Sequence, residues 1–325
     1  MVPDWAAASS ALTRGLSRLA LRALAVGGAV GIVSFFLMRA LPGDAAYRIA
    51  AGRYGYDMVN SATAEAVRYE LGLDQPWWQQ LAHWIGDLAR GQLGVSLVSG
   101  ESVTQELVHQ LGHTVSLSLA AWSLALVVGL TLGFTAALAR QHWLDNTLIA
   151  LGLALKATPT FVLALMLALL LAEHAQWLPA AGHGEAAHFV LPSITLALGL
   201  TAGLAMVTLQ TVRRVLQAPW VEFARSKGLA AGPVLRRHVL RNAATPIAAY
   251  SATQLVLLVE GVVVVESFFA WPGIGHALIH ALISRDIPMV QGTALCMGWL
   301  FVVLNALVDA VCWLLDPRLH DRMPV

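Results

Sequence analysis

Long apolar stretches alternate with shorter polar ones along most of this 325-residue chain. A membrane-spanning helix needs about 20 consecutive, mostly apolar residues. Six windows meet this requirement, namely residues 20–38, 115–139, 146–171, 189–212, 247–269 and 288–315. The pattern therefore predicts an all-α, polytopic membrane protein with six transmembrane helices and membrane lipid as its surroundings.

A cleaved signal peptide is an alternative interpretation of the first window. Its apolar core is longer than the roughly 7–15 residues typical of such peptides. The sequence also shows no convincing cleavage site before residue 41. We therefore interpret this window as the first span.

Polar segments between the windows suggest how the chain is divided. Residues 41–114 carry four Arg and eight Asp or Glu, which predicts a small folded domain outside the membrane. We divide the chain into residues 1–40, the N-terminus and first span; residues 41–114, an extracytoplasmic insertion; and residues 115–325, a five-helix core. The core includes a polar loop at 213–245 and a second loop at 270–287.

The distribution of Lys and Arg predicts the orientation, because these residues are enriched in short cytoplasmic loops. The side that holds both termini carries Arg14, Arg18, Arg22, Arg140, Arg213, Arg214, Arg225, Lys227, Arg236, Arg237, Arg241, Arg318 and Arg322. The opposite side has Arg285 in its short loops, and Arg39 at the end of the first window counts against the assignment. Both termini and loop 213–245 are therefore predicted to be cytoplasmic.

The composition also indicates a membrane protein. Hydrophobic residues make up 58% of the chain and charged residues 12%, whereas a soluble domain is about half apolar and a quarter charged. The basic loop is tethered between two spans, so we expect no nucleic-acid partner. Cys296 and Cys312 would lie about 24 Å apart along one helix, too far for a disulfide. No Cys/His cluster has zinc spacing, so we expect no metal site.

The basic stretch WVEFARSKGLAAGPVLRRHVLRN, residues 220–242, is more ordered in its pattern than a connector needs to be. Pro219 suits the first position of a helix. Gly228 suits its end, because glycine adopts left-handed backbone angles at little cost. The pattern predicts a turn at 229–233 and then a second helix, separate from the fifth span that Pro246 opens. Snorkelling arginines would explain the charge but not this spacing.

The same stretch resembles the EAA-xxx-G signature of ABC importer permeases, and more narrowly the dipeptide/oligopeptide/nickel permease family. The resemblance implies that this loop is a coupling helix that docks on a cytoplasmic ATPase. The coupling residues would be Glu222, Phe223, Ala224, Arg225, Ser226, Lys227, Gly228 and Leu229. A small residue such as Ala224 would let the helix sit close to its partner. Phe223 replaces the first Ala of the signature, and Arg241 stands where the wider signature has Pro.

Further matches to this family follow in order along the chain. They lie at residues 41–44, 71–76, 86–88, 159–161, 176–179, 263–266, 269–275, 285–291, 305, 309 and 316–318. The resemblance implies the first of two permease chains, in a bacterial inner membrane. The outward-loop residues that contact a binding protein would be Trp271, Pro272, Gly273, Gly275, Arg285 and Asp286.

The resemblance also implies partners and cargo. The partners would be a second permease subunit in a heterodimer, two cytoplasmic ATPase subunits that use ATP and Mg, and an extracytoplasmic substrate-binding protein. The cargo would be a peptide, with nickel or a metal chelate as the alternative. A secondary transporter or channel, which needs no ATPase, is the rival class.

The chain itself carries no nucleotide-binding or catalytic pattern. Its only lysines, Lys156 and Lys227, follow no Gly-x-x-x-x-Gly phosphate loop. No order of Ser, His and Asp or of Cys and His suggests hydrolysis. We therefore expect a non-catalytic subunit that binds no cofactor, with ATP hydrolysed by separate chains.

Two ionisable residues lie deep inside predicted spans. Lys156 and Glu260 would sit roughly 15 and 20 Å from the cytoplasmic face, where a charge usually faces a bundle interior, a wet cavity or a partner. Three interpretations stay open: the two residues pair, Glu260 lines the substrate path, or Glu260 pairs with the second permease subunit. We take Glu260, Lys156 and Gln254 as candidate translocation-path residues.

Other polar residues in the spans have simpler interpretations. Glu266 and Asp309 lie toward the ends of their spans, where interfacial solvation or interhelical hydrogen bonds are expected. Pro159 is expected to kink the third span. His109/His113 and His276/His280 have i, i+4 spacing, and we interpret them as surface residues because metal sites usually need three or more ligands.

Overall fold

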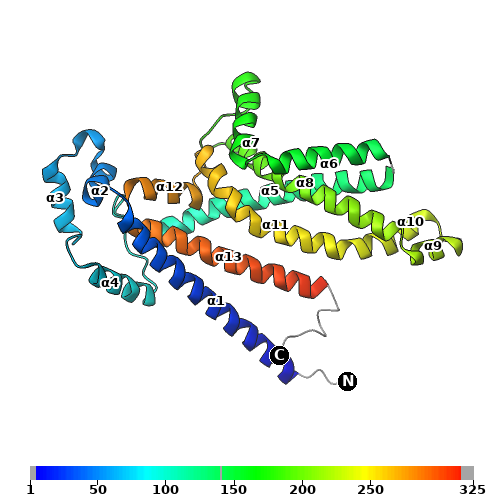
Figure 1. Ribbon diagram of the computed structural model, residues 1–325, viewed down its shortest axis with the longest axis horizontal. Helices are drawn as coiled ribbons and strands as arrows, with labels where there is room; N and C mark the ends of the chain where they lie inside the picture. Colours follow the sequence, from blue (N-terminus) through cyan, green and yellow to red (C-terminus); the bar gives the residue numbers. More distant parts are fainter. Residues whose placement is uncertain (1–4, 140, 316–325) are drawn as a thin grey trace. The chain divides into compact units, whose positions relative to one another are not determined.

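The computed structural model describes residues 5–139 and 141–315, and these residues are almost all helical (Figure 1). Extended pairing within them is limited to one isolated bridge, between Val95 and Ser102. The all-α fold is therefore confirmed. Several residues used above lie outside the described backbone or side chains: Arg14, Arg140, Arg318, Arg322 and the match at 316–318.

Five helices are long and apolar enough to cross a membrane. They are α1 (Trp5–Ala40, apolar from Ser17), α5 (Val103–Ala139), α8 (Ala186–Leu216), α11 (Leu240–Phe268) and α13 (Ile287–Leu315). Each covers one of the predicted windows, although α11 ends one residue before the end of its window. α5 begins twelve residues before its window, at Val103 instead of residue 115, because the polar turns that precede the apolar run are helical too.

The third predicted span is a pair of helices bent by 104°, α6 (His142–Ala157) and α7 (Thr160–Leu167). A π-helical turn, η2 (Ala168–His174), follows α7. Thr158 is extended, with φ −86° and ψ 121°, and its hydroxyl donates to the Ala154 carbonyl at 2.8 Å. Pro159 disfavours helical angles at the residue before it. The predicted kink is therefore a complete break, which Figure 1 shows as α7 turned away from α6.

The chain forms two compact units, residues 1–114 with 272–303 and residues 115–271 with 304–325. The boundary after residue 114 coincides with the end predicted for the extracytoplasmic insertion. The first unit also takes in most of the predicted outward loop, which the sequence analysis had grouped with the core.

The first unit contains the helices of the insertion. These are α2 (Ala45–Tyr54), the 3-10 turn η1 (Tyr56–Met58), α3 (Ser61–Glu70) and α4 (Trp77–Ala89). Asp44 caps α2 by accepting from Ala46 N at 2.9 Å. Ile49 and Val67 are almost fully buried between α2 and α3, so this segment has a small apolar core of its own.

In the second unit, α8 packs closely against several helices. An added Cβ at Gly133 of α5 would lie 2.5 Å from Thr208 Cβ, and one at Gly203 of α8 would lie 2.2 Å from the Tyr250 hydroxyl of α11. Small residues let helix backbones approach closely in membranes. These glycines therefore allow α8 to pack directly against α5 and α11. This packing fixes the position of α8, the helix that leads into the basic loop.

Candidate functional site

The basic loop contains a short helix, α9 (Pro219–Ser226), that begins at the predicted proline. Val221 is fully buried and Ala224 is 8% exposed, and both pack into the core of the second unit. Glu222 lies exposed on the surface, and the side chain of Phe223 is 60% exposed. α9 therefore has one face packed on the protein and another face open.

The exit from α9 depends on Gly228, which has φ +82°. Lys227 N donates to Phe223 O at 3.2 Å and Leu229 N to Ala224 O at 3.4 Å, so the chain turns sharply here. An added Cβ at Gly228 would meet no atom within 4 Å. The need for glycine therefore comes from the backbone angle alone, as the sequence predicted.

Two details of the loop differ from the sequence analysis. Ala224 faces the protein interior, so its small size permits close packing of α9 on its own chain. The helix after the turn is continuous with the fifth span: α10 (Ala231–Val234), the π-helical turn η3 (Leu235–Val239) and α11 follow without interruption, and Pro246 lies inside α11. Membrane helices tolerate a proline where neighbouring groups satisfy the freed carbonyl. The Arg225 side chain lies outside the described part.

A partly buried ion pair fixes the helices at the base of this loop. Arg213, near the end of α8, donates through both terminal nitrogens to the Asp145 carboxylate, one of the bonds being 2.7 Å long. Its Nη2 also donates to the Ala136 carbonyl at 3.1 Å. The Asp145 side chain is 10% exposed. One guanidinium thus joins the end of α5, the start of α6 and the end of α8, just before α9 begins.

The candidate translocation-path residues fall into two groups. Lys156, in the last turn of α6, and Glu260 of α11 are both exposed, whereas Gln254 is 5% exposed. Among the described residues, no ion pair joins Lys156 to Glu260 or either of them to another side chain. The interpretation that the two residues satisfy each other is therefore not supported in this chain.

The other two acids in the spans differ from each other. Glu266 is fully buried, which excludes interfacial solvation and leaves hydrogen bonding inside the protein. Asp309 is exposed. Both have polar or electrostatic contacts, so neither is an isolated charge.

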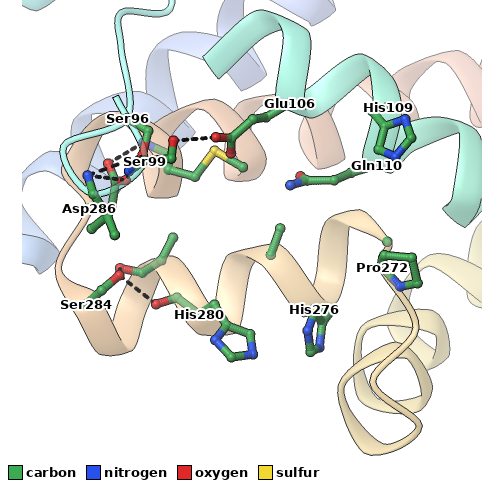
Figure 2. A pocket seen from close by; sticks show the side chains of 15 residues that line it. Ser96, Ser99, Glu106, His109, Gln110, Pro272, His276, His280, Ser284 and Asp286 are labelled. Carbon is green, nitrogen blue, oxygen red and sulfur yellow. Dashed lines mark hydrogen bonds between the residues drawn. The ribbon is translucent and has the colours of Figure 1, made fainter. Parts of the chain in front are cut away.

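The predicted outward loop forms a helix, α12 (Ile274–Ser284), next to a pocket shown in Figure 2. Most of the residues expected to contact a binding protein are buried: Trp271, Gly273, Gly275, Arg285 and Asp286, with Pro272 half-buried. Arg285 donates to the Gly43 carbonyl at 2.7 Å and also to the Pro42 carbonyl. This guanidinium therefore holds the segment that follows α1.

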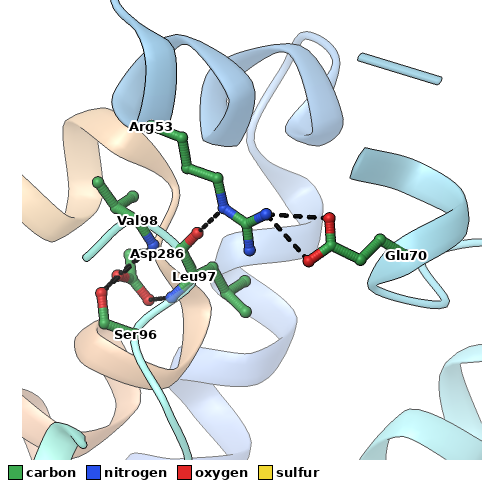
Figure 3. A network of polar contacts seen from close by, with 6 residues as sticks. All are labelled: Arg53, Glu70, Ser96, Leu97, Val98 and Asp286. Atoms are coloured by element: carbon green, nitrogen blue, oxygen red, sulfur yellow. Dashed lines mark hydrogen bonds and ion pairs between the residues drawn. The ribbon is translucent and has the colours of Figure 1, made fainter. Parts of the chain in front are cut away.

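Asp286 organises a second set of contacts (Figure 3). Its carboxylate is 2% exposed and accepts from Ser96 Oγ at 2.5 Å, Leu97 N at 3.1 Å and Met289 N at 3.3 Å. Arg53 connects the same segment to α3, because it donates to the Leu97 carbonyl and to Glu70 at 3.1 Å. The family-matching residues of the outward loop thus bind their own chain.

The histidine pairs lie as their spacing predicted. The Nε2 atoms of His109 and His113 are 3.4 Å apart, and the rings of His276 and His280 are centred 4.4 Å apart. Within residues 5–139 and 141–315, no group of three or more His, Cys, Asp or Glu is arranged to hold a metal ion.

Comparison with known proteins decides the family. Residues 129–321 match the model of the binding-protein-dependent transport system inner membrane component family. The chain belongs to this family. The predicted resemblance to ABC importer permeases is confirmed, and the protein is a multi-pass transport subunit of the inner membrane.

Similar proteins cover almost the whole chain. A Brucella suis protein named as a peptide transport system permease is 38% identical over 299 residues, which is 90% of this chain and 94% of the relative. The glutathione transport system permease GsiC of Pectobacterium atrosepticum is 33% identical, again over 90% of this chain and 94% of the relative. The membrane subunit in solved structures of the MetNI methionine ABC transporter has a TM-score of 0.51 at 15% identity, covering 66% of this chain and 97% of its own length. That last likeness concerns the fold alone.

The sequence analysis did not identify the residues that hold the basic loop and the predicted outward loop in place. Asp145 gave a weak signal, as an acid near basic residues at the end of a span that was predicted to be cytoplasmic. Ser96 gave none, because its partner Asp286 lies 190 positions away.

Proposed function

We propose that this chain is one permease subunit of an ATP-driven importer that takes up peptides delivered by a binding protein. The observation that carries the proposal is α9, a short helix with an open face and a glycine-dependent exit, in a chain of the binding-protein-dependent transport family. A simple connector between two spans does not need a defined helix and a fixed turn, whereas a surface that docks a second protein does.

The open face of α9 supports an ATPase as the partner. Phe223 and Leu229 are 60% and 47% exposed, and Lys227 Nζ lies 4.6 Å from the centre of the Phe223 ring. An exposed aromatic residue rimmed by charges such as Glu222 is typical of a protein contact. Two ATPase subunits, using ATP and Mg, would bind this loop and its counterpart on a second permease subunit.

A peptide is the cargo that the relatives favour. The Brucella suis and Pectobacterium atrosepticum proteins are named as peptide and glutathione permeases, and glutathione is itself a modified tripeptide. Nickel is named for neither of these relatives. A peptide brings both an amine and a carboxylate, so its path needs groups of both signs.

Lys156 and Glu260 would supply such groups. Each is exposed and, among the described residues, lacks an ionic partner. A charge facing lipid costs about 3 kcal/mol or more, so we propose that these side chains face the substrate path or the second permease subunit. Gln254 is buried, so contact of Gln254 with cargo would require α11 to separate from its neighbours.

Gly228→Val tests the proposal directly. Valine at φ +82° is strained, so the exit from α9 should distort without any steric clash. We expect peptide uptake by the reconstituted transporter to fall at least about tenfold. Folding of the variant and its insertion into the membrane should not change. Gly232→Val is the matched control, since Gly232 also has open space around it and no positive φ.

The two variants separate the function classes. An ATP-independent channel or secondary transporter would move cargo equally well in both variants, and that result would refute the coupling role. Uptake of peptide by the unaltered protein without any ATPase subunit would refute it as well.

A further inference from the structure

A pocket of about 390 Å³ lies in the first unit, between the N-terminal turns of α5 and α12 (Figure 2). Small-molecule and side-chain pockets in proteins are of roughly this size or larger. Pro272, Gly273 and Asp286, which were expected to contact a binding protein, form part of its lining. The buried outward-loop residues therefore build the wall of a cavity.

The two walls are fixed at both ends. At one end, Ile274 N of α12 donates to the Thr114 hydroxyl of α5 at 2.9 Å. At the other end, Asp286 binds Ser96 Oγ and Leu97 N at 2.5 and 3.1 Å. A cleft that is held at both ends keeps its shape without a ligand, which lowers the cost of binding one.

The lining is mostly apolar, with a single available acid. Ala277, Ala281 and Met289 contribute apolar surface, and Glu106 projects from α5. One Glu106 oxygen accepts from Ser99 Oγ at 2.5 Å, and no other side chain of the lining binds the Glu106 carboxylate. Gln110, one turn further along α5, has a buried amide oxygen without a hydrogen-bond partner. No Lys or Arg lines the pocket, and its basic side chains are those of His109, His276 and His280.

We infer that this pocket receives a lysine or arginine side chain of the extracytoplasmic binding protein. Such a side chain lays its aliphatic stem on apolar surface and carries its charge at the tip, which matches apolar walls that end at Glu106. A zwitterionic peptide fits less well, because its carboxylate would approach Glu106 and Asp286, and the lining has no Lys or Arg to balance it. The inference rests on the proposed function, which supplies the binding protein as partner.

Glu106→Gln tests the inference in the complete transporter in lipid nanodiscs. The glutamine oxygen can still accept from Ser99, so the loop keeps its hydrogen bond while the charge is lost. We expect the dissociation constant for the binding protein to rise at least about tenfold, with a weaker dependence on salt. Glu101→Gln is the matched control, since Glu101 is an exposed acid five residues away that does not line the pocket.

A charge exchange identifies the partner residue. Glu106→Arg should abolish docking, and one Lys→Glu or Arg→Glu substitution on the binding protein should restore it. The inference is overturned if Glu106→Gln and Glu101→Gln bind the binding protein equally well. It is also overturned if Glu106→Gln changes only the KM for cationic cargo, because the pocket would then serve the cargo.

Failure of the pocket inference and failure of the proposed function give different results. ATP-driven uptake that responds to Gly228→Val, together with unchanged docking in Glu106→Gln, would remove only the pocket inference. Absence of ATP-driven uptake in the unaltered complex would instead remove the proposed function, and the docking measurement would still report on the pocket.

Discussion

The basic loop and the predicted outward loop carry family-matching residues of opposite character. In the basic loop, Phe223 and Leu229 are largely exposed and α9 offers an open face. In the outward loop, Arg285 and Asp286 are 7% and 2% exposed and bind distant parts of their own chain. Matching a family motif therefore does not say whether a residue contacts a partner or holds a loop in place. Burial and hydrogen bonding distinguish the two roles. Substitution of a residue that holds a loop in place should lower the free energy of unfolding more than substitution of a residue that contacts a partner.

Asp286→Ala should have the largest effect on stability. The carboxylate accepts from Ser96 Oγ, Leu97 N, Val98 N and Met289 N, and its removal leaves several buried donors unpaired. We expect a loss of about 3 kcal/mol or more, measured by denaturant unfolding in detergent. Asp74→Ala, at an exposed acid, is the control. Equal stability of the two variants would mean that Asp286 is not a structural residue.

Asp145→Asn, at the base of the basic loop, should have the next largest effect. It removes the charge that binds Arg213 and leaves a partly buried guanidinium unbalanced. We expect a loss of about 2 kcal/mol, together with a lower ratio of peptide transported to ATP hydrolysed, because the base of the coupling loop is no longer fixed. Combining Asp145→Asn with Arg213→Gln should recover part of the stability. If the double variant is as unstable as the sum of the singles, the two residues do not act as a pair.

Asp44→Asn should have a smaller effect in the outward region. Burial tends to raise the pKa of Asp44, but hydrogen bonds from Arg68 and Ala46 outweigh it, so the pKa lies below its usual value. A lowered pKa gives stability that is present above about pH 4 and is lost as the pH falls through the folded-state pKa. The ion pair is about half exposed, so we expect less than about 1 kcal/mol at pH 7.

Thermal unfolding of the Asp44→Asn variant across pH checks this expectation. Asparagine still caps α2, so the comparison isolates the charge. The difference from the unaltered protein should shrink as the pH is lowered below about 4. A difference that grows at acid pH would contradict the sign of the shift.

Phe223→Ala should have the smallest effect on stability and a large effect on transport. The side chain is exposed, so its removal should change the unfolding free energy by less than about 0.5 kcal/mol. If Phe223 is an aromatic docking residue, its replacement by alanine should lower the affinity for the ATPase subunit at least about tenfold. Trp143→Ala is a control, because Trp143 is also an exposed aromatic residue (62%) but lies outside α9. A strong loss of stability in Phe223→Ala would place this residue with the scaffold.

Much of the architecture could be predicted from the pattern of residues. Five of the six apolar windows lie in long helices. A run of about twenty apolar residues in lipid must satisfy its own backbone hydrogen bonds, and a helix does this. The third window was predicted as one kinked span, whereas Thr158 and Pro159 break it into two helices bent by 104°. Local rules foresee a disturbance at a proline, but the packing of α7 determines how far the chain turns.

The amino-acid sequence alone determined five of the six predicted spans, the start of α9 at Pro219 and the turn at Gly228. Each of these follows from local physics: transfer of apolar residues into lipid, the fixed φ of proline and the freedom of glycine. The tertiary structure alone decided that Ala224 faces inward, that Arg213 binds Asp145, and that the outward-loop residues wall a pocket around Glu106. These arrangements join residues far apart in the chain, up to 190 positions for Ser96 and Asp286, and no local pattern encodes which of many polar groups will meet.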